Sequence, residues 1–281
     1  MIDFIFVHFH SITFLKAQKE IFEYCNTRDE YRIIVVDGTG NIEERKQLTE
    51  LKKVGFIDEL YFYNALKLDL KKGIDGSAQH AEGINKAMGF VKNEIVCIQD
   101  NDFFYFRKGF CKTIEKYFVD KKVLMFGPLH HHILELSLKT KFKIKIKNYL
   151  NKINGLPLLN EWRSPVFFGT AIRKSFIESN LLTFDFDPIV FKTRGFDVAY
   201  KIHELIDNKY RNCWVSLIPK KMEQFNRNGA IAYSYYLFHE IFGAHFLRGS
   251  KAKESFENLD EFEKAELLKQ EFIEEIMKYI L

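Results

Sequence analysis

The sequence lacks features that would assign it to several specialised classes of protein. Its four cysteines form no CxxC pair and show no pairing rhythm, which predicts buried free thiols in a reducing compartment. No window approaches the roughly 18 apolar residues of a membrane span. No basic segment precedes an apolar stretch at the start of the chain, so residues 2–7 are predicted to be a strand rather than part of a signal peptide. We therefore expect a cytoplasmic protein.

Nucleic acid is not an expected partner of this chain. The formal net charge is +4, but no dense stripe of Lys and Arg and no nucleic-acid-binding signature accompanies it. A mildly basic chain is compatible instead with an anionic ligand or a membrane surface.

The composition fits one globular domain. The chain has 281 residues, of which 47% are hydrophobic and 28% charged, and this is enough for one large core. No internal repeat, low-complexity segment or Pro/Gly/Ser linker divides it. We expect one domain over residues 1–250, with halves at 1–110 and 111–250, and a helical tail at 251–281.

Strands and helices alternate in the first half. Short apolar, β-branched runs predict strands, and apolar residues at helical spacing predict helices. The predicted strands are 2–7, 31–36, 57–63 and 94–99, and the predicted helices are 13–25, 41–53 and 77–91. This alternation predicts an α/β fold with a mostly parallel central sheet and helices on both faces.

The second half has a weaker pattern. Strands are predicted at 123–127, 166–172 and 212–217, and helices at 195–208, 233–248 and 259–280.

Three polar clusters directly follow predicted strands of the first half. They are His8-Phe9-His10, Asp37-Gly38 and Asp100-Asn101-Asp102. In open α/β sheets, ligands bind at the carboxyl ends of parallel strands, so these clusters are expected to converge on one edge of the sheet.

Asp100 and Asp102 are the candidate metal ligands. Two carboxylates in a turn after a strand can hold a hard divalent cation, Mn²⁺ or Mg²⁺, while leaving positions open for substrate phosphates. An isolated Asp-x-Asp is more often a plain turn that ends a strand, so the flanking segments decide between the two interpretations.

Those flanks resemble glycosyltransferases of the GT-A type, in particular family 2. The resemblance covers residues 2–110 and is carried by FIFVHFHS at 4–11, IIVVDGTGN at 33–41, GSAQHAEGINKAMG at 76–89 and IVCIQDNDFFYF at 95–106. The four segments occur in the family's order. The resemblance implies a Rossmann-like GT-A fold with C-terminal helices, a nucleotide-sugar-binding half at 1–110 and an acceptor-side half at 111–250.

The resemblance also implies roles for single residues. His8, Asp37, Gly76, Ser77, His80 and Asp100 match nucleotide-sugar-binding positions, and Asp102 matches the direct metal ligand. The loop 38–41 is poorer in Ser and Asp than is usual in the family. Ala81-Glu82 stands where the family often has Arg-Asn.

Two further roles are expected in the second half. An inverting transferase needs a carboxylate that deprotonates the acceptor, and Asp197 matches the family's place for this base, with Asp185 and Asp187 as alternatives. The family often adds a C-terminal His to the metal site. On one continuous helix His239 and His245 would lie about 240° apart, so we expect one of them to bind, and we favour His239 because His245 shares an apolar face.

The acceptor side is indicated by fewer residues. Trp162 is the expected acceptor-side aromatic. The Lys-alternating run 139–147 is either a protected edge strand or a contact with anionic lipid or a lipid-linked diphosphate.

The expected function is metal-dependent transfer of a sugar from a nucleotide diphosphate, most simply a UDP-sugar, to a saccharide or lipid-linked acceptor. Analogy with the family suggests bacterial surface glycan (polysaccharide) synthesis at the inner membrane face, with peripheral membrane contact. The C-terminal helix is expected to pack on the domain or on a second copy in a homodimer.

Two other functions remain open. A sugar-phosphate nucleotidyltransferase normally opens with a Gly-rich, Arg- and Lys-bearing phosphate loop, which HFHSITFLK at 8–16 lacks. A non-catalytic nucleotide- or saccharide-binding module on the same fold would not hydrolyse the donor.

Overall fold

The structure is a computed structural model that describes residues 1–9, 12–65, 74–129, 146, 149–150, 166–187, 198–210, 213–225, 231–247 and 259–280. Within these residues one ten-stranded sheet has the order β3-β2-β1-β4-β7-β6-β8-β9-β10-β5. Its strands are β1 (Ile2–His8), β2 (Tyr31–Asp37), β3 (Glu59–Phe62), β4 (Ile95–Gln99), β5 (Phe103–Tyr105), β6 (Met125–Pro128), β7 (Gly169–Arg173), β8 (Trp214–Lys221), β9 (Ile231–Leu237) and β10 (Glu240–Leu247).

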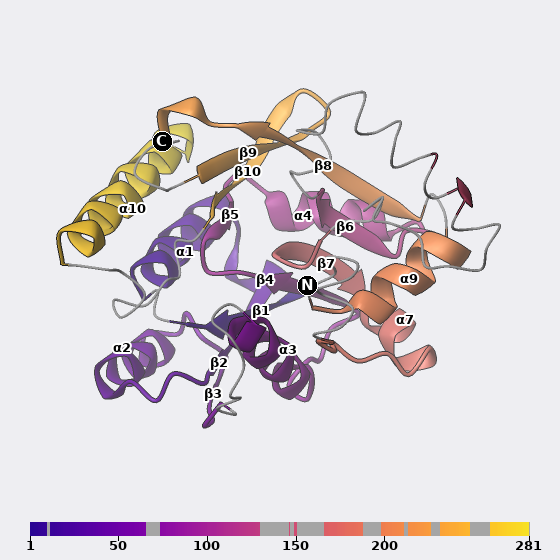
Figure 1. Cartoon of the computed structure of the whole chain (residues 1–281), viewed down its shortest axis with the longest axis horizontal. Coiled ribbons are helices and arrows are strands. Elements are labelled where there is room, and N and C mark those ends of the chain that lie inside the picture. Colours follow the sequence, from indigo (N-terminus) through magenta and orange to yellow (C-terminus); the bar gives the residue numbers. More distant parts are fainter. Residues whose placement is uncertain are drawn as a thin grey trace.

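Helices lie on both faces of this sheet (Figure 1). They are α1 (Ile12–Cys25), α2 (Ile42–Lys53), α3 (Ile74–Met88), α4 (Phe110–Phe118), α7 (Lys174–Ser179), α9 (Tyr200–Lys209) and α10 (Leu259–Ile280), with short 3₁₀ turns η1 (Arg28–Glu30) and η2 (Glu223–Phe225). Helices α1, α2, α4 and α10 share one hydrophobic core, and α3, α7 and α9 share the other. The predicted α/β class with flanking helices is confirmed.

The first-half strands form a parallel block, β3-β2-β1-β4. Strands β1, β2 and β4 are covered on both faces, so they are mostly apolar rather than alternating, whereas the edge strand β3 exposes Tyr61 and Phe62. Phe4 and Phe6 of β1 face the α1 side, whereas Ile5 and Val7 face the α3 side. Helix α3 approaches β1 closely at Gly83, where an added Cβ would lie 2.5 Å from a methyl carbon of Val7.

Parallel register brings the strand ends together as predicted. His8 is paired with Asp37 across β1 and β2, and β4 runs beside β1 up to the Asp100 turn. The three polar clusters therefore begin at one edge of the sheet.

The sheet continues with mixed pairing. Strand β7 runs antiparallel between β4 and β6, and β8 pairs with β6 through its first half and with β9 through its second. The long strand β8 thus carries the sheet from the parallel block to the β9–β10 hairpin.

The helix predicted at 233–248 is wrong, because this segment forms β9, a turn and β10. Four successive β9 residues, 232–235, are buried, so the strand lacks the polar alternation that would distinguish it from a helix. Phe238 makes the turn with a left-handed φ of 57°.

Helix α10 confirms the helix predicted at 259–280. Its Phe272 is fully buried, with its ring 6.0 Å from that of Phe104 on β5 and 5.0 Å from that of Phe246 on β10. The helix shares a core with the rest of the chain, and the domain boundary drawn at residue 250 stays a prediction.

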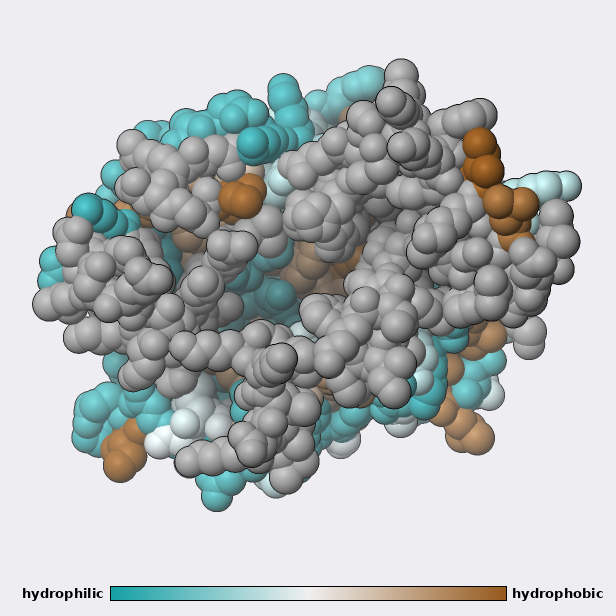
Figure 2. All heavy atoms as spheres, in the orientation of Figure 1, coloured by the Kyte–Doolittle hydropathy of each residue, from teal (hydrophilic) through white to brown (hydrophobic). Residues whose placement is uncertain are grey.

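On the face shown in Figure 2, the described surface is mostly hydrophilic, and the visible hydrophobic atoms form separate groups. In the part of the chain that the structure describes, no helix is long and apolar enough to cross a membrane.

Candidate functional site

The turn after β4 is fixed by three backbone hydrogen bonds. The Asp100 amide donates to the carbonyl of Phe168 at 3.1 Å, and the Phe246 amide donates to the carbonyl of Asp102 at 2.9 Å. Within the turn, the Phe103 amide donates to the Asp100 carbonyl at 3.1 Å. The segment before β7 and strand β10 therefore hold the turn from two sides.

Two buried glutamines, Gln18 and Gln99, form hydrogen bonds that support the same turn. Gln18 of α1 donates through Nε2 to the carbonyls of Asn101 (3.2 Å) and Phe103 (2.6 Å). Gln99 donates to Gln18 Oε1 at 3.1 Å and to the carbonyl of Phe103 at 2.8 Å. Side chains locked in this way preorganise the residues they support. Neither glutamine was predicted from the sequence, where the one available signal was a polar residue, Gln18, on the otherwise apolar face of α1.

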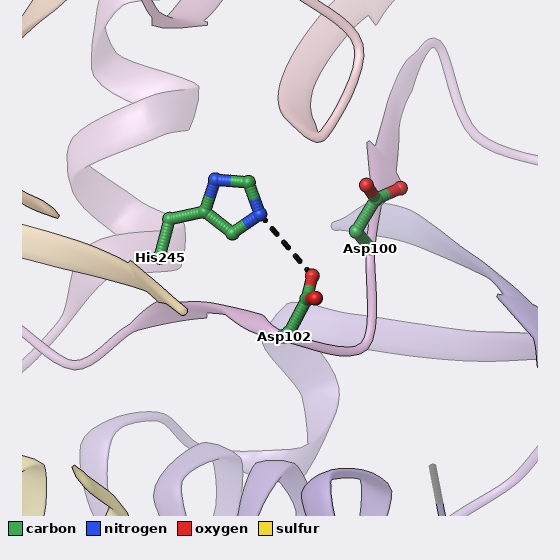
Figure 3. Close-up of side chains that lie close together, drawn as sticks. All are labelled: Asp100, Asp102 and His245. Carbon is green, nitrogen blue, oxygen red and sulfur yellow. Dashed lines mark hydrogen bonds and ion pairs between the residues drawn. The ribbon is translucent and has the colours of Figure 1, made fainter. Parts of the chain in front are cut away.

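Asp100, Asp102 and His245 form a cluster that could hold a metal ion (Figure 3). One ligand atom from each lies within 4.8 Å of the other two. His245 Nε2 is 3.2 Å from Asp102 Oδ1, and both of these residues are buried, whereas Asp100 is partly exposed. Two carboxylates and one imidazole suit a divalent cation with oxygen and nitrogen ligands, and the open side at Asp100 leaves room for a substrate ligand.

The ring of His245 is held by aromatic neighbours. It stacks on Phe168 with ring centroids 4.4 Å apart and an interplanar angle of 26°. Phe103, its register partner across β10 and β5, contacts it edge-on at 6.0 Å. These contacts aim Nε2 at Asp102.

The structure brings His245, rather than the favoured His239, to the two aspartates. His239 lies on the exposed turn between β9 and β10. The preference for it assumed a helix, on which an apolar face implies a core position. In the hairpin, the same apolar surroundings position His245 beside the Asp100–Asp102 turn.

His80 is the second histidine near this cluster. It lies on α3, and its Nε2 is 3.4 Å from Asp100 Oδ1. Gly76 and Ser77 lie in the first turn of α3, which begins at Ile74, three residues before the predicted start of this helix. Their predicted contact with a nucleotide sugar stays a prediction.

Asp37 is fully buried at the end of β2 and already has two partners. Its Oδ2 accepts from Arg45 Nε at 2.7 Å, and its Oδ1 accepts from the Thr39 hydroxyl at 2.7 Å. Its predicted contact with a base or ribose would have to use the remaining lone pairs.

His8 is fully buried at the end of β1. Its Nε2 is 3.2 Å from Glu44 Oε2 of α2, and its Nδ1 is 3.2 Å from the side-chain amide of Asn101. From the sequence, His8 was expected on the nucleotide side, and the structure also links it to the Asp100–Asp102 turn.

Several predicted features lie outside the described residues, namely Asp197, Trp162 and all of the run 139–147 except Ile146. Asp185, an alternative to Asp197, pairs with Lys201 at 2.6 Å. Partial burial raises the pKa of Asp185, but this is outweighed by Lys201 and a hydrogen bond with Thr183, so its pKa is below the usual range. A lowered pKa makes Asp185 a weaker base.

No family model and no curated protein sequence matches the chain. Solved structures do resemble it. A mannosyltransferase, PcManGT from Pyrobaculum calidifontis in complex with GDP-Man and Mn²⁺, is 14% identical over 65% of this chain and 47% of that one, with a TM-score of 0.44. S. aureus TarS residues 1–349 with UDP-GlcNAc is 11% identical over 65% of this chain and 48% of that one, with a TM-score of 0.42.

A third similar structure is the glucosyl-3-phosphoglycerate synthase of Mycobacterium tuberculosis with Mn²⁺, UDP and glucosyl-3-phosphoglycerate. It is 10% identical over 78% of this chain and 69% of that one, with a TM-score of 0.45. The chain spans about half the length of the first two.

Proposed function

We propose that this chain is a metal-dependent glycosyltransferase that uses a nucleotide-diphosphate sugar. The observation that carries the proposal is the Asp100, Asp102 and His245 cluster at the carboxyl end of the parallel block β3-β2-β1-β4. A ligand at this edge of an open α/β sheet lies against the ends of several strands. The resemblance of residues 2–110 to family 2 of the GT-A type supports the same function.

Asp102 and His245 are the buried residues that would hold the cation. The partly exposed Asp100 would bind it from the side that faces solvent. A divalent cation supplies charge neutralisation for the diphosphate as it leaves. His80, beside Asp100, faces the same region and adds a nitrogen that can donate to a phosphate oxygen.

The proposed transfer is inverting. The acceptor oxygen bonds to the anomeric carbon while the bond from that carbon to the diphosphate oxygen breaks, and a carboxylate takes the acceptor proton. Asp197 is the proposed base. A UDP-sugar donor, a saccharide or lipid-linked acceptor and action at the cytoplasmic face of a membrane in surface glycan synthesis complete the proposal, on the strength of the sequence resemblance.

The first test is the melting temperature with UDP-, GDP-, CMP- and dTDP-linked sugars, each with and without Mn²⁺. A ligand that binds the native state at a hundred times its Kd stabilises it by about 2.7 kcal/mol. We expect a Mn²⁺-dependent rise with one nucleotide in the wild type and none in Asp102→Ala.

Product analysis of the same samples separates the functions. Slow Mn²⁺-dependent hydrolysis of the donor supports a transferase, while binding without hydrolysis or transfer points to a non-catalytic module. No shift with any donor, in a folded sample, would contradict the proposal.

A further inference from the structure

Two adjacent charged residues at the start of helix α2, Glu44 and Arg45, contact the carboxyl ends of the neighbouring strands β1 and β2. Asn41 caps the helix by accepting from the amides of Glu43 at 3.0 Å and Glu44 at 3.2 Å, which fixes its first turn. From that turn, Arg45 bonds Asp37 at the end of β2, and Glu44 reaches His8 at the end of β1. Helix α2 lies beside these strands in Figure 1.

His8 extends this connection to the metal-binding turn. It is fully buried, and the side chain of Glu44 is only 14% exposed. The two contacts are complementary if Nε2 carries the proton and donates to Glu44, while Nδ1 accepts from the Asn101 amide. The acidic partner favours this tautomer, as carboxylates do for metal-bound histidines. The chain of contacts thus runs from α2 through β1 to the residue between Asp100 and Asp102.

Asn101 is held at two points. Gln18 binds its backbone carbonyl, and His8 binds its side chain. Asn101 shares peptide groups with both aspartates, so fixing its orientation restricts the directions in which their carboxylates can point.

We propose that His8, braced by Glu44, is a positioning residue that orients the metal-binding turn through Asn101. The proposal rests on the proposed function only in taking the Asp100, Asp102 and His245 cluster as a metal site. It means that cation affinity depends on a helix that supplies no ligand to the cation. It also couples the nucleotide side of the edge, at β1 and β2, to the metal side at β4.

The test measures binding of Mn²⁺ alone, by the loss of the free-ion signal in electron paramagnetic resonance. His8→Phe fills the space but removes both nitrogens, and Glu44→Ala removes the brace. Loss of a supporting partner typically weakens a metal site by 10–100-fold, and we expect about tenfold for His8→Phe and a smaller loss for Glu44→Ala.

Two histidine replacements separate the two contacts. His8→Asn keeps an acceptor near the place of Nδ1 and should recover most of the Mn²⁺ affinity. His8→Gln keeps a polar group near the place of Nε2 and should remain as weak as His8→Phe. A residue needed only to fill space would give equal affinities for all three variants.

Two controls match the perturbations. Glu43→Ala removes a neighbouring carboxylate from the same helix turn, where it has the same interaction with the helix dipole. Its side chain is 74% exposed, and Mn²⁺ affinity should not change. Arg32→Gln breaks an ion pair with the buried Asp3 at the opposite end of β1 and β2, so it should lower the melting temperature while leaving Mn²⁺ affinity intact.

Wild-type Mn²⁺ affinity in folded Glu44→Ala and His8→Phe would overturn the proposal, as would an equal loss in Arg32→Gln. If His8→Phe does not fold, the comparison of Mn²⁺ affinity between Glu44→Ala and Glu43→Ala decides. Because no donor is present, sugar transfer can fail while this pattern of Mn²⁺ affinities holds. That result would contradict the proposed function and leave the role of His8 standing.

Discussion

At the scale of single residues, His245 is defined by its neighbours. Phe168 stacks on one face of its ring, and Asp102 lies 3.2 Å from its Nε2. An imidazole in an aromatic setting is ordinarily a core residue. The carboxylate at its tip is what makes it a candidate ligand, and that carboxylate is 143 residues away in the chain.

Replacing His245 by Phe should weaken Mn²⁺ binding at least about tenfold, because losing a ligand costs no less than losing a supporting residue. The aromatic stack with Phe168 can be preserved, but the buried Asp102 loses its contact with the imidazole, so the melting temperature without metal should fall. His239→Phe, on the exposed turn, is the matched control and should bind Mn²⁺ like the wild type. Equal affinities for the two variants, measured by Mn²⁺ titration, would remove His245 from the site.

At the scale of elements, helix α10 packs on the end of the sheet formed by β10 and β5, beside the Asp100–Asp102 turn. Its buried face meets α1, β5 and β10, the elements that hold Gln18, Phe103 and His245. The helix thus supports the site without contributing a ligand to it.

Phe272→Ala should destabilise the protein by about 3–5 kcal/mol, as large-to-small changes of a buried Phe do. Its ring contacts Phe225, Phe104 and Phe246, so the deletion leaves a cavity beside β10. Leu267→Ala on the same helix removes a side chain that is 59% exposed and should cost about 0.5 kcal/mol or less. Urea unfolding of both variants checks this, and similar losses would show that α10 is not packed as described.

At the scale of the whole molecule, acid stability is linked to His203. This residue of α9 is 1% exposed and lies against the ring of Phe167 at 5.2 Å. Burial lowers the pKa of His203 to about 3, against 6.5 for an ordinary histidine. The unfolded chain therefore binds a proton below pH 6.5 that the folded chain does not bind until about pH 3.

Stability from this residue is present above pH 6.5 and is lost as the pH falls from 6.5 towards 3. One pKa unit corresponds to about 1.4 kcal/mol, so protonation of His203 in the unfolded chain should lower the free energy of unfolding of the wild type by about 2 kcal/mol at pH 5. Urea unfolding at pH 7 and pH 5 measures this loss. Between these two pH values the free energy of unfolding should fall by about 2 kcal/mol less in His203→Leu than in the wild type. His239→Phe should keep the wild-type pH dependence. A His203→Leu variant with the same acid loss as the wild type would show that His203 is not buried in its neutral form.

Local sequence pattern determined the parallel half of the fold and the position of the acidic turn. Strands β1, β2 and β4 are short, mostly apolar runs that end in polar residues, and parallel pairing places these ends on one edge. This pattern was enough to predict that His8, Asp37 and Asp100 lie at the same edge of the sheet. Their common position depends on strand order and direction rather than on contacts between distant residues.

Only the tertiary structure decided which side chains surround the acidic turn. Strands β9 and β10 are buried on both faces, so their residues show no polar alternation, and the local sequence could not distinguish a hairpin from a helix. His245 meets Asp102 through the register between β10 and β5, and Gln18 and His8 meet Asn101 through helix packing and strand order. Contacts between residues 83 to 143 positions apart depend on how whole elements pack, and local periodicity carries no information about that packing.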